Sequence, residues 1–227
     1  LTIGGKTLDD RTLPLLAGLA DLEELSTNQS ALTDDGYRHF KQFPKLRSLA
    51  MFHPSWALKE FTGAGLAHLK DCPKLERLTF AGSTAGDAAM EAVGQIKQLK
   101  DFSTWHTAQT PDGNKHLLKL TDLRSLRLGQ RLPKGGAPSP ASLDASTLPL
   151  IAKLTKLQKL EIFEARLTAK DLEPLKALPE LKQLTMHTVD IPATDVEAVK
   201  AAMKNVKVDV KPLTAEERES LAKKLKL

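Results

Sequence analysis

The chain is poor in cysteine and in aromatic residues, and it has no long apolar run. Cys72 is the only cysteine among 227 residues, which excludes an internal disulfide framework and a cysteine-based zinc site. Aromatic residues make up only 4% of the chain, so any clustering of rings is informative. No apolar run approaches the roughly 18 residues of a membrane-spanning helix. The sequence therefore predicts no membrane span, and its length suffices for a hydrophobic core.

An excess of one charge is also missing from most of the chain. The 33 Lys and Arg residues against 28 Asp and Glu residues give a net charge of +5. Residues 200–227 contain eight basic and four acidic residues, and so contribute +4 of that total. A basic tail of this kind can contact nucleic acid or anionic lipid, or it can be a solvated helix face.

Leucine, in contrast, is abundant, with 40 of the 227 positions. Segments with leucine at the first position, leucine (in one segment Phe102) at the fourth and an apolar or small residue at the sixth recur along the chain. They start at Leu22, Leu46, Leu75, Leu99, Leu123, Leu157 and Leu181. The steps between them are 24, 29, 24, 24, 34 and 24 residues. One further step in each direction reaches an apolar pair, Leu1 with Ile3 and Val208 with Val210. Nine registers of strand, turn and helix are therefore predicted, and such small units must stack on their neighbours to bury a core.

These repeats resemble those of a known family. The segments 22–27, 123–128 and 181–186 resemble leucine-rich repeats, and the helical halves 32–36 and 61–69 resemble the bacterial 24-residue GALA-like subclass. The resemblance covers residues 1–210. It implies an α/β solenoid with a parallel β-sheet on the concave face and helices on the convex face. It also implies protein binding, in some members as a substrate adaptor. The asparagine usual at the ninth position is absent, so the return from each strand must be built differently.

The two ends of the solenoid differ in sequence. Residues 211–227 contain a capping-box pattern, Thr214 to Glu217, followed by Leu221 and Leu225 on one helical face. We expect them to form a C-terminal capping helix after a solenoid of residues 1–210. The chain begins inside a strand register, so we expect either a further upstream segment that covers residues 1–5 or a strand there that ends the sheet bluntly.

Two insertions fall between strand and helix. One includes residues 53–56, and the other covers residues 129–142. They should project from the same rim of the solenoid, where loops often carry function. Length drift is the alternative, because a longer surface loop costs little free energy.

The candidate binding residues follow from strand alternation, which directs the third, fifth and seventh positions of each strand to the concave face. The third and fifth columns are mixed in charge, which disfavours nucleic acid as a partner. Rings concentrate in the seventh column, where Ala81 and Gly129 lie between them. We expect successive rings to lie about 10 Å apart along one edge of the sheet. The candidate binding residues are Phe52, His53, Trp56, Trp105, His106, Phe163 and His187, with Arg77 and Arg127 beside them.

Signatures of catalysis are not found in the sequence. It contains no nucleophile elbow, phosphate-binding loop or zinc-protease helix motif. Cys72 occupies a helical column that is otherwise apolar, so it should be a core residue. Three histidines, His39, His68 and His116, align on the convex face without carboxylate partners, which favours plain surface histidines over a metal site. We expect no cofactor, no metal and no enzymatic activity.

Three functions stay open at this point. The first is a non-enzymatic module that binds a protein through the concave face and the aromatic residues. The second is a glycan-binding module at a cell envelope, because sugar rings also stack on aromatic side chains. The third is an accessory domain that presents substrate to a larger enzyme. We expect a monomer, and the compartment does not follow from the sequence.

Overall fold

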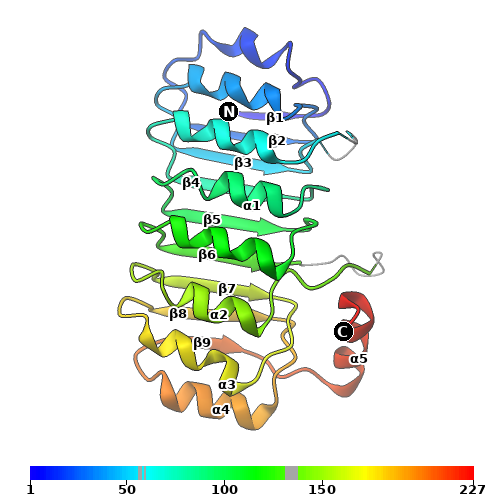
Figure 1. Ribbon diagram of the computed structural model, residues 1–227, viewed down its shortest axis with the longest axis vertical. Coiled ribbons are helices and arrows are strands. Elements are labelled where there is room, and N and C mark those ends of the chain that lie inside the picture. The colour runs from blue at the N-terminus through cyan, green and yellow to red at the C-terminus, as the bar shows by residue number, and fades with distance from the viewer. Residues whose placement is uncertain (56–57, 59, 131–137) are drawn as a thin grey trace.

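Nine parallel strands form one sheet in the part of the chain that the computed structural model describes, which is residues 1–55, 58, 60–130 and 138–227. The strands lie side by side in chain order (Figure 1). They are β1 (Thr2–Gly4), β2 (Glu24–Asn28), β3 (Ser48–Phe52), β4 (Arg77–Ala81), β5 (Asp101–Trp105), β6 (Ser125–Gly129), β7 (Lys159–Phe163), β8 (Gln183–His187) and β9 (Lys207–Val210). At the two ends, Ile3 pairs with Thr27 and Val208 pairs with Leu184, which confirms both terminal registers.

Short helices connect the strands and cover one face of the sheet. The α-helices are α1 (Asp87–Val93), α2 (Leu148–Ile151), α3 (Ala169–Leu172), α4 (Ala193–Ala202) and α5 (Ala215–Leu225). The 3₁₀ helices are η1 (Leu13–Leu16), η2 (Asp35–Gln42), η3 (Ala64–Asp71), η4 (Pro111–Lys119), η5 (Ala145–Thr147) and η6 (Glu173–Ala177). Eight residues span about 16 Å as a 3₁₀ helix but only about 12 Å as an α-helix. The 3₁₀ form therefore matches a five-residue strand of about 16 Å, which a 24-residue repeat must run back along.

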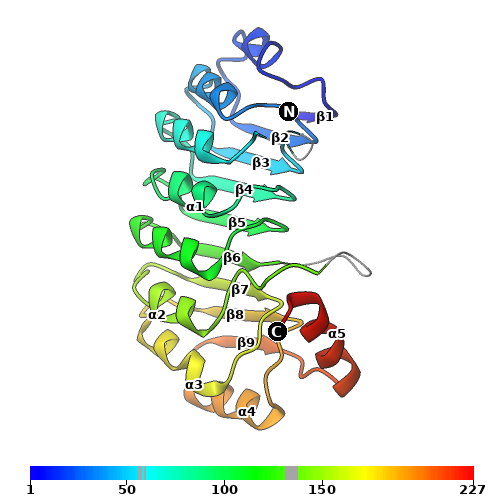
Figure 2. The same ribbon diagram turned by 45° about the vertical axis from the view of Figure 1, so that its right-hand side comes forward.

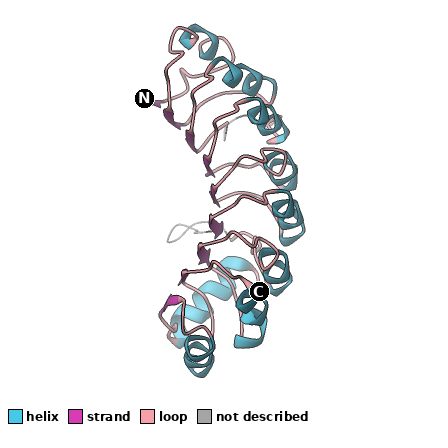
Figure 3. Cartoon of the chain, turned by 90° about the vertical axis from the view of Figure 1, so that its left-hand side faces the viewer, coloured by secondary structure: helices cyan, strands magenta, loops and turns pink. Residues whose placement is uncertain are grey.

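The stack of repeats curves into an arc. Figure 3 shows the strands on the inner side of the arc and the helices on the outer side. The core lies between these two layers and is filled by the fourth and sixth positions of each strand, such as Leu49 and Met51, and by helical leucines, such as Leu66 and Leu69. The predicted α/β solenoid, with a concave parallel sheet and convex helices, is confirmed.

The strands end in a left-handed turn at the eighth position of the repeat. Residues there have φ between 48° and 87°; they are Gly5, Gln29, His53, Gly82, His106, Glu164 and Thr188. In five of these seven residues the amide donates to the carbonyl at the seventh position of the next repeat, for example from His53 to Ala81 at 2.7 Å and from Glu164 to His187 at 3.0 Å. This left-handed turn makes the return from the strand without an asparagine at the ninth position.

Aspartates join the helical layers of neighbouring repeats. Asp34 accepts hydrogen bonds from the Thr62 amide at 2.9 Å, the Thr62 hydroxyl at 2.7 Å and the Gly65 amide at 2.9 Å. The two hydrogen bonds to threonine recur between Asp10 and Thr33 and between Asp87 and Thr110. Because each aspartate satisfies amides that begin the next helix, the contact stabilises the stacking of repeats.

The C-terminal helix α5 lies beside the carboxyl ends of β7 to β9 (Figures 1 and 2). Its capping box is present, and Leu221 and Leu225 are buried. The Arg218 Nε atom lies 3.4 Å from Asp190 Oδ1, and the Lys224 carbonyl accepts a 2.8 Å hydrogen bond from the Ser139 amide. Residues 211–227 thus contact the loops that follow the strands, while the boundary at residue 210 stays a prediction.

Candidate functional site

Five of the predicted binding residues form a continuous row across the concave face, from β3 to β8. We call Phe52, Trp105, Arg127, Phe163 and His187 the aromatic row. The ring centroids of Phe52 and Trp105 are 6.2 Å apart. The Arg127 guanidinium lies 5.7 Å from the Trp105 ring centroid and 5.9 Å from that of Phe163. The rings of Phe163 and His187 stack with centroids 4.5 Å apart. Each member of the row therefore contacts the next.

Small residues on the intervening strands allow these contacts. Ala81 pairs with both Phe52 and Trp105 in the sheet, and these two rings lean toward each other over it. Their separation of 6.2 Å is shorter than the spacing of about 10 Å expected from strand geometry alone. Gly129 has φ 135°, and a Cβ atom there would lie 2.1 Å from the Phe163 carbonyl oxygen. Only glycine fits at this position without moving β7.

An ion pair fixes the cation in the middle of the row. Arg127 donates from Nε and Nη2 to the two carboxylate oxygens of Glu161, both at 2.9 Å. The His187 Nε2 atom lies 3.8 Å from the same carboxylate. A two-bond fork of this kind holds the guanidinium plane in one orientation. Glu161 was not among the predicted binding residues, although its place at the same repeat position as Arg127, one strand later, is a signal for a cross-strand ion pair.

The aromatic row is accessible to a partner. Phe52, Trp105 and Phe163 are half-buried, whereas the His187 side chain is 46% exposed. Core rings such as Phe80 are buried, with only 2% exposure. The rings therefore lean over small neighbours and still present surface to solvent.

A hollow of about 490 Å³ adjoins the C-terminal part of the row, over β6 to β9. Its lining combines ring, amide, hydroxyl and charged groups: Arg127, Glu161, Phe163, Gln183, Thr185, His187 and Asp209. The Gln183 amide donates to the Thr185 hydroxyl at 3.2 Å, so part of the lining is already ordered. A side chain of a bound molecule would find both apolar and hydrogen-bonding contacts there.

The other predicted site residues lie outside the row. Arg77 forms an ion pair with Glu24 at 2.7 Å in the N-terminal half of the concave face. His53 and His106 occupy left-handed turns on the rim, and His53 Nδ1 lies 3.1 Å from the Asn28 side-chain oxygen. Trp56 lies outside the described residues.

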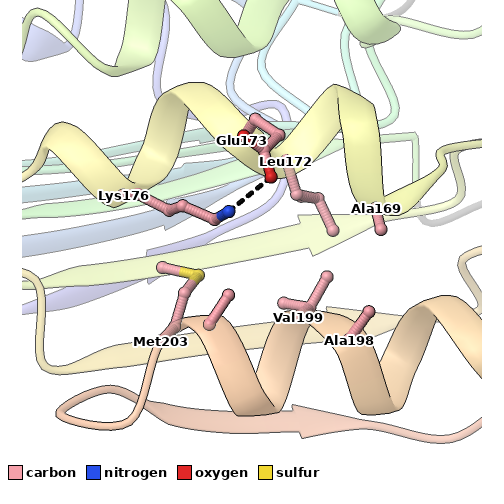
Figure 4. Close-up of a pocket in the computed structure, with 8 residues that line it drawn as sticks. Ala169, Leu172, Glu173, Lys176, Ala198, Val199 and Met203 are labelled. Atoms are coloured by element: carbon pink, nitrogen blue, oxygen red, sulfur yellow. Dashed lines mark hydrogen bonds and ion pairs between the residues drawn. The ribbon is translucent and has the colours of Figure 1, made fainter.

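Other possible sites offer little room or reactivity. A crevice of about 40 Å³ separates α3 and η6 from α4 on the convex side, where Leu172, Val199 and Met203 meet (Figure 4). It can hold no more than a few water molecules. Burial raises the pKa of the Cys72 thiol to about 12, and nearby Asp71 adds to this effect. Within the described ranges, no three His, Cys, Asp or Glu side chains gather as metal ligands, and no helix could cross a membrane.

Comparison with known proteins gives the fold a name. No model of a known protein family matches the chain, and no curated protein matches it. Among solved structures, internalin C2 of Listeria monocytogenes is similar over 86% of this chain and 74% of its own, with 17% identity and a TM-score of 0.53. The fold is that of a leucine-rich-repeat solenoid.

Two further leucine-rich-repeat structures are similar over most of this chain. An internalin (inlF) of the same bacterium matches 92% of this chain and 68% of its own, with 18% identity and a TM-score of 0.48. A leucine-rich-repeat protein of Leptospira interrogans matches 86% of this chain and 56% of its own, with 17% identity and a TM-score of 0.44.

Proposed function

We propose that this leucine-rich-repeat chain is a non-enzymatic module that binds another protein through its concave face, with the aromatic row as the anchor. The observation that carries the proposal is the continuous contact from Phe52 through Trp105, Arg127 and Phe163 to His187 on a surface that is otherwise polar. We further assign the repeats to the 24-residue GALA-like subclass, which their 24-residue steps support.

The chemistry of the row suits a protein partner. Tryptophan, tyrosine and arginine dominate the binding energy of protein interfaces, and such residues cluster near the interface centre. The bidentate pair with Glu161 already holds Arg127 in place. Side chains that are ordered before binding lose less conformational entropy when a partner arrives. The row therefore has the composition and the rigidity of an interface centre.

The arrangement of the rings favours protein over glycan. Phe163 lies on β7, with His187 stacked on it from β8 and the Arg127 guanidinium above it from β6. Sugar recognition by stacking needs an open ring face, but both sides of this ring are occupied. A protein side chain in the adjoining hollow can instead contact ring edges and the polar lining.

Support for a non-enzymatic role comes from the state of the reactive groups. The Cys72 thiol is buried and resists ionisation because its pKa is raised. Arg127 and Glu161 at the hollow are committed to each other in an ion pair. A general base or a nucleophile would have to be free to exchange a proton with substrate.

Affinity capture tests the proposal. The bait is the folded chain, and the variant carries Phe52→Ser, Trp105→Ser and Phe163→Ser. A matched control carries Leu15→Ser, which removes an apolar side chain that is 80% exposed far from the row. Circular dichroism establishes that all three chains are folded. We expect a protein that the native chain and the control retain and that the triple variant loses.

The retained protein is then identified, purified and titrated against each chain. Loss of a hot spot costs at least about 2 kcal/mol, so the triple variant should bind at least about thirtyfold more weakly. Equal binding by the triple variant and the native chain would refute the aromatic row as the anchor. Retention of a glycan in place of a protein would refute the protein assignment.

A further inference from the structure

The last strand of the sheet has a free edge. Within the described residues, β9 pairs with β8 and with no other strand. Helix α5 does not lie along this edge, because it turns to the carboxyl ends of the strands (Figures 1 and 2). The helix of the last complete repeat, α4, follows β8 and precedes β9 in the chain. Among the described residues, the sheet thus ends in a single strand whose backbone groups on one side have no strand partner, and α4 lies at the same end of the solenoid on its convex side (Figure 1).

The sequence of this strand is chemically symmetric about its centre. Residues 206–210 read Val, Lys, Val, Asp, Val, and we call them the β9 segment. Its three valines are half-buried and pack against the core. Lys207 and Asp209 are exposed and alternate with the valines, so they lie on the concave face. Val208 is the centre of the pattern.

We propose that two copies of the chain associate through antiparallel pairing of their β9 segments, about a twofold axis at Val208. In this register, Lys207 of each chain lies opposite Asp209 of the other. Val206 lies opposite Val210, and the two Val208 residues lie opposite each other. Two opposite-charge pairs and three apolar pairs then form between directly opposed residues, whose Cβ atoms are about 5 Å apart.

The signs of the charges select a second copy as the occupant of the edge. Edge strands that avoid pairing often carry lysine, and charges of one sign on such a strand would repel a second copy. Here, Lys207 and Asp209 attract in the antiparallel twofold register. The other free edge, β1 (Thr2–Gly4), carries no charged residue and is one residue shorter than β9. A head-to-tail contact would therefore leave both β9 charges without a partner.

The sequence after β9 limits the length of this contact. The antiparallel pair ends before Pro212, which has no amide to donate to a ladder. A twofold axis perpendicular to the sheet keeps both concave faces on the same side. The dimer would present two aromatic rows to a partner and could gain avidity for a repetitive one. The pairing itself does not depend on what the aromatic row binds.

Reversing the charges of Lys207 and Asp209 tests the proposal. The molar mass of the wild-type chain is measured by light scattering after size exclusion, over a range of concentrations. Lys207→Asp places two aspartates in the β9 segment, and Asp209→Lys places two lysines there. Lys159→Asp is the matched control, because this exposed lysine has the equivalent position on the interior strand β7. Circular dichroism confirms that each variant keeps the fold.

The expected results form a pattern that a local structural effect cannot produce. The wild type and the Lys159→Asp control should shift with concentration from 24.8 kDa toward twice that mass. Each single variant at the β9 segment should stay at 24.8 kDa, because like charges face each other. An equimolar mixture of the two single variants, and the double variant, should dimerise again.

A wild-type chain that stays monomeric at the highest concentration would overturn the proposal. So would dimers that both charge reversals leave intact, or masses that grow beyond a dimer, since an open-ended contact would then be at work. The same measurement tests the monomer that the sequence led us to expect.

Discussion

Replacing Gly129 with alanine should destabilise the chain and disturb the aromatic row. Gly129 has φ 135°, and an added Cβ would lie 2.1 Å from the Phe163 carbonyl oxygen and 2.8 Å from the Phe163 Cβ. A backbone in this region costs an L-residue about 1–2 kcal/mol. Relief of the overlap costs about 1–3 kcal/mol more, because both atoms belong to the neighbouring strand and its side chain. We expect a loss of about 2–5 kcal/mol in the free energy of unfolding.

Urea unfolding followed by far-ultraviolet circular dichroism measures this loss. The control is Gly18→Ala, because nothing lies within 4 Å of an added Cβ there. An exposed glycine with ordinary φ should gain up to about 1 kcal/mol on substitution with alanine. The near-ultraviolet signal of Gly129→Ala should also change, since Phe163 must move. If the two alanine variants unfold within about 0.5 kcal/mol of each other, the reasoning about this glycine is wrong.

Three further results are expected. Asp34→Ala should lower the free energy of unfolding by about 1–3 kcal/mol, because the Thr62 and Gly65 amides of the next repeat lose their acceptor. Asp35→Ala should lower it by less than about 1 kcal/mol in the same urea assay. Burial raises the pKa of Cys72 from 9.0 to about 12, so its thiol should react with a disulfide reagent at pH 8 only after unfolding. The folded state holds the thiol proton more tightly than the unfolded state does, so the stability of the wild type relative to Cys72→Ala is fully present below pH 9. This stability difference should fall as the pH rises toward 12, which the urea midpoints of the two chains would show. A difference between the two midpoints that stays constant with pH would contradict this. Arg127→Met should lower the free energy of unfolding by about 1 kcal/mol. It should alter the near-ultraviolet circular dichroism of Trp105 while the far-ultraviolet spectrum stays native. An unchanged near-ultraviolet spectrum would show that the Arg127 guanidinium does not contact the Trp105 ring.

The repeat pattern was sufficient to predict the architecture. Apolar residues at the first and fourth positions of a 24-residue unit can be buried only if the units stack on one another. The strand registers followed from the same spacing, down to the terminal pairs of Ile3 and Val208. The form of the helices did not follow, because the balance between 3₁₀ and α depends on how far each short segment must reach across the core.

The candidate site could be predicted only in part. Column position placed Phe52, Trp105 and Phe163 on one surface, because strand alternation is fixed by backbone geometry. That Arg127 bridges two rings depends on its side-chain rotamer and on Glu161, which belongs to the next strand. The repeat register places Arg127 and Glu161 side by side although they are 34 positions apart, but it does not determine the side-chain rotamers that form the contact.

The C-terminal helix shows the same division. Its capping box and its two buried leucines were readable from residues 214–225, since they depend on neighbours within one helix. Its location beside the strand ends was not readable, because it is decided by contacts with Ser139 and Asp190 far along the chain. The sequence by itself determined the repeat, the register and the residues that face each side. Only the tertiary structure decided which of those residues meet and which edge of the sheet stays free, because both depend on how separate repeats pack together.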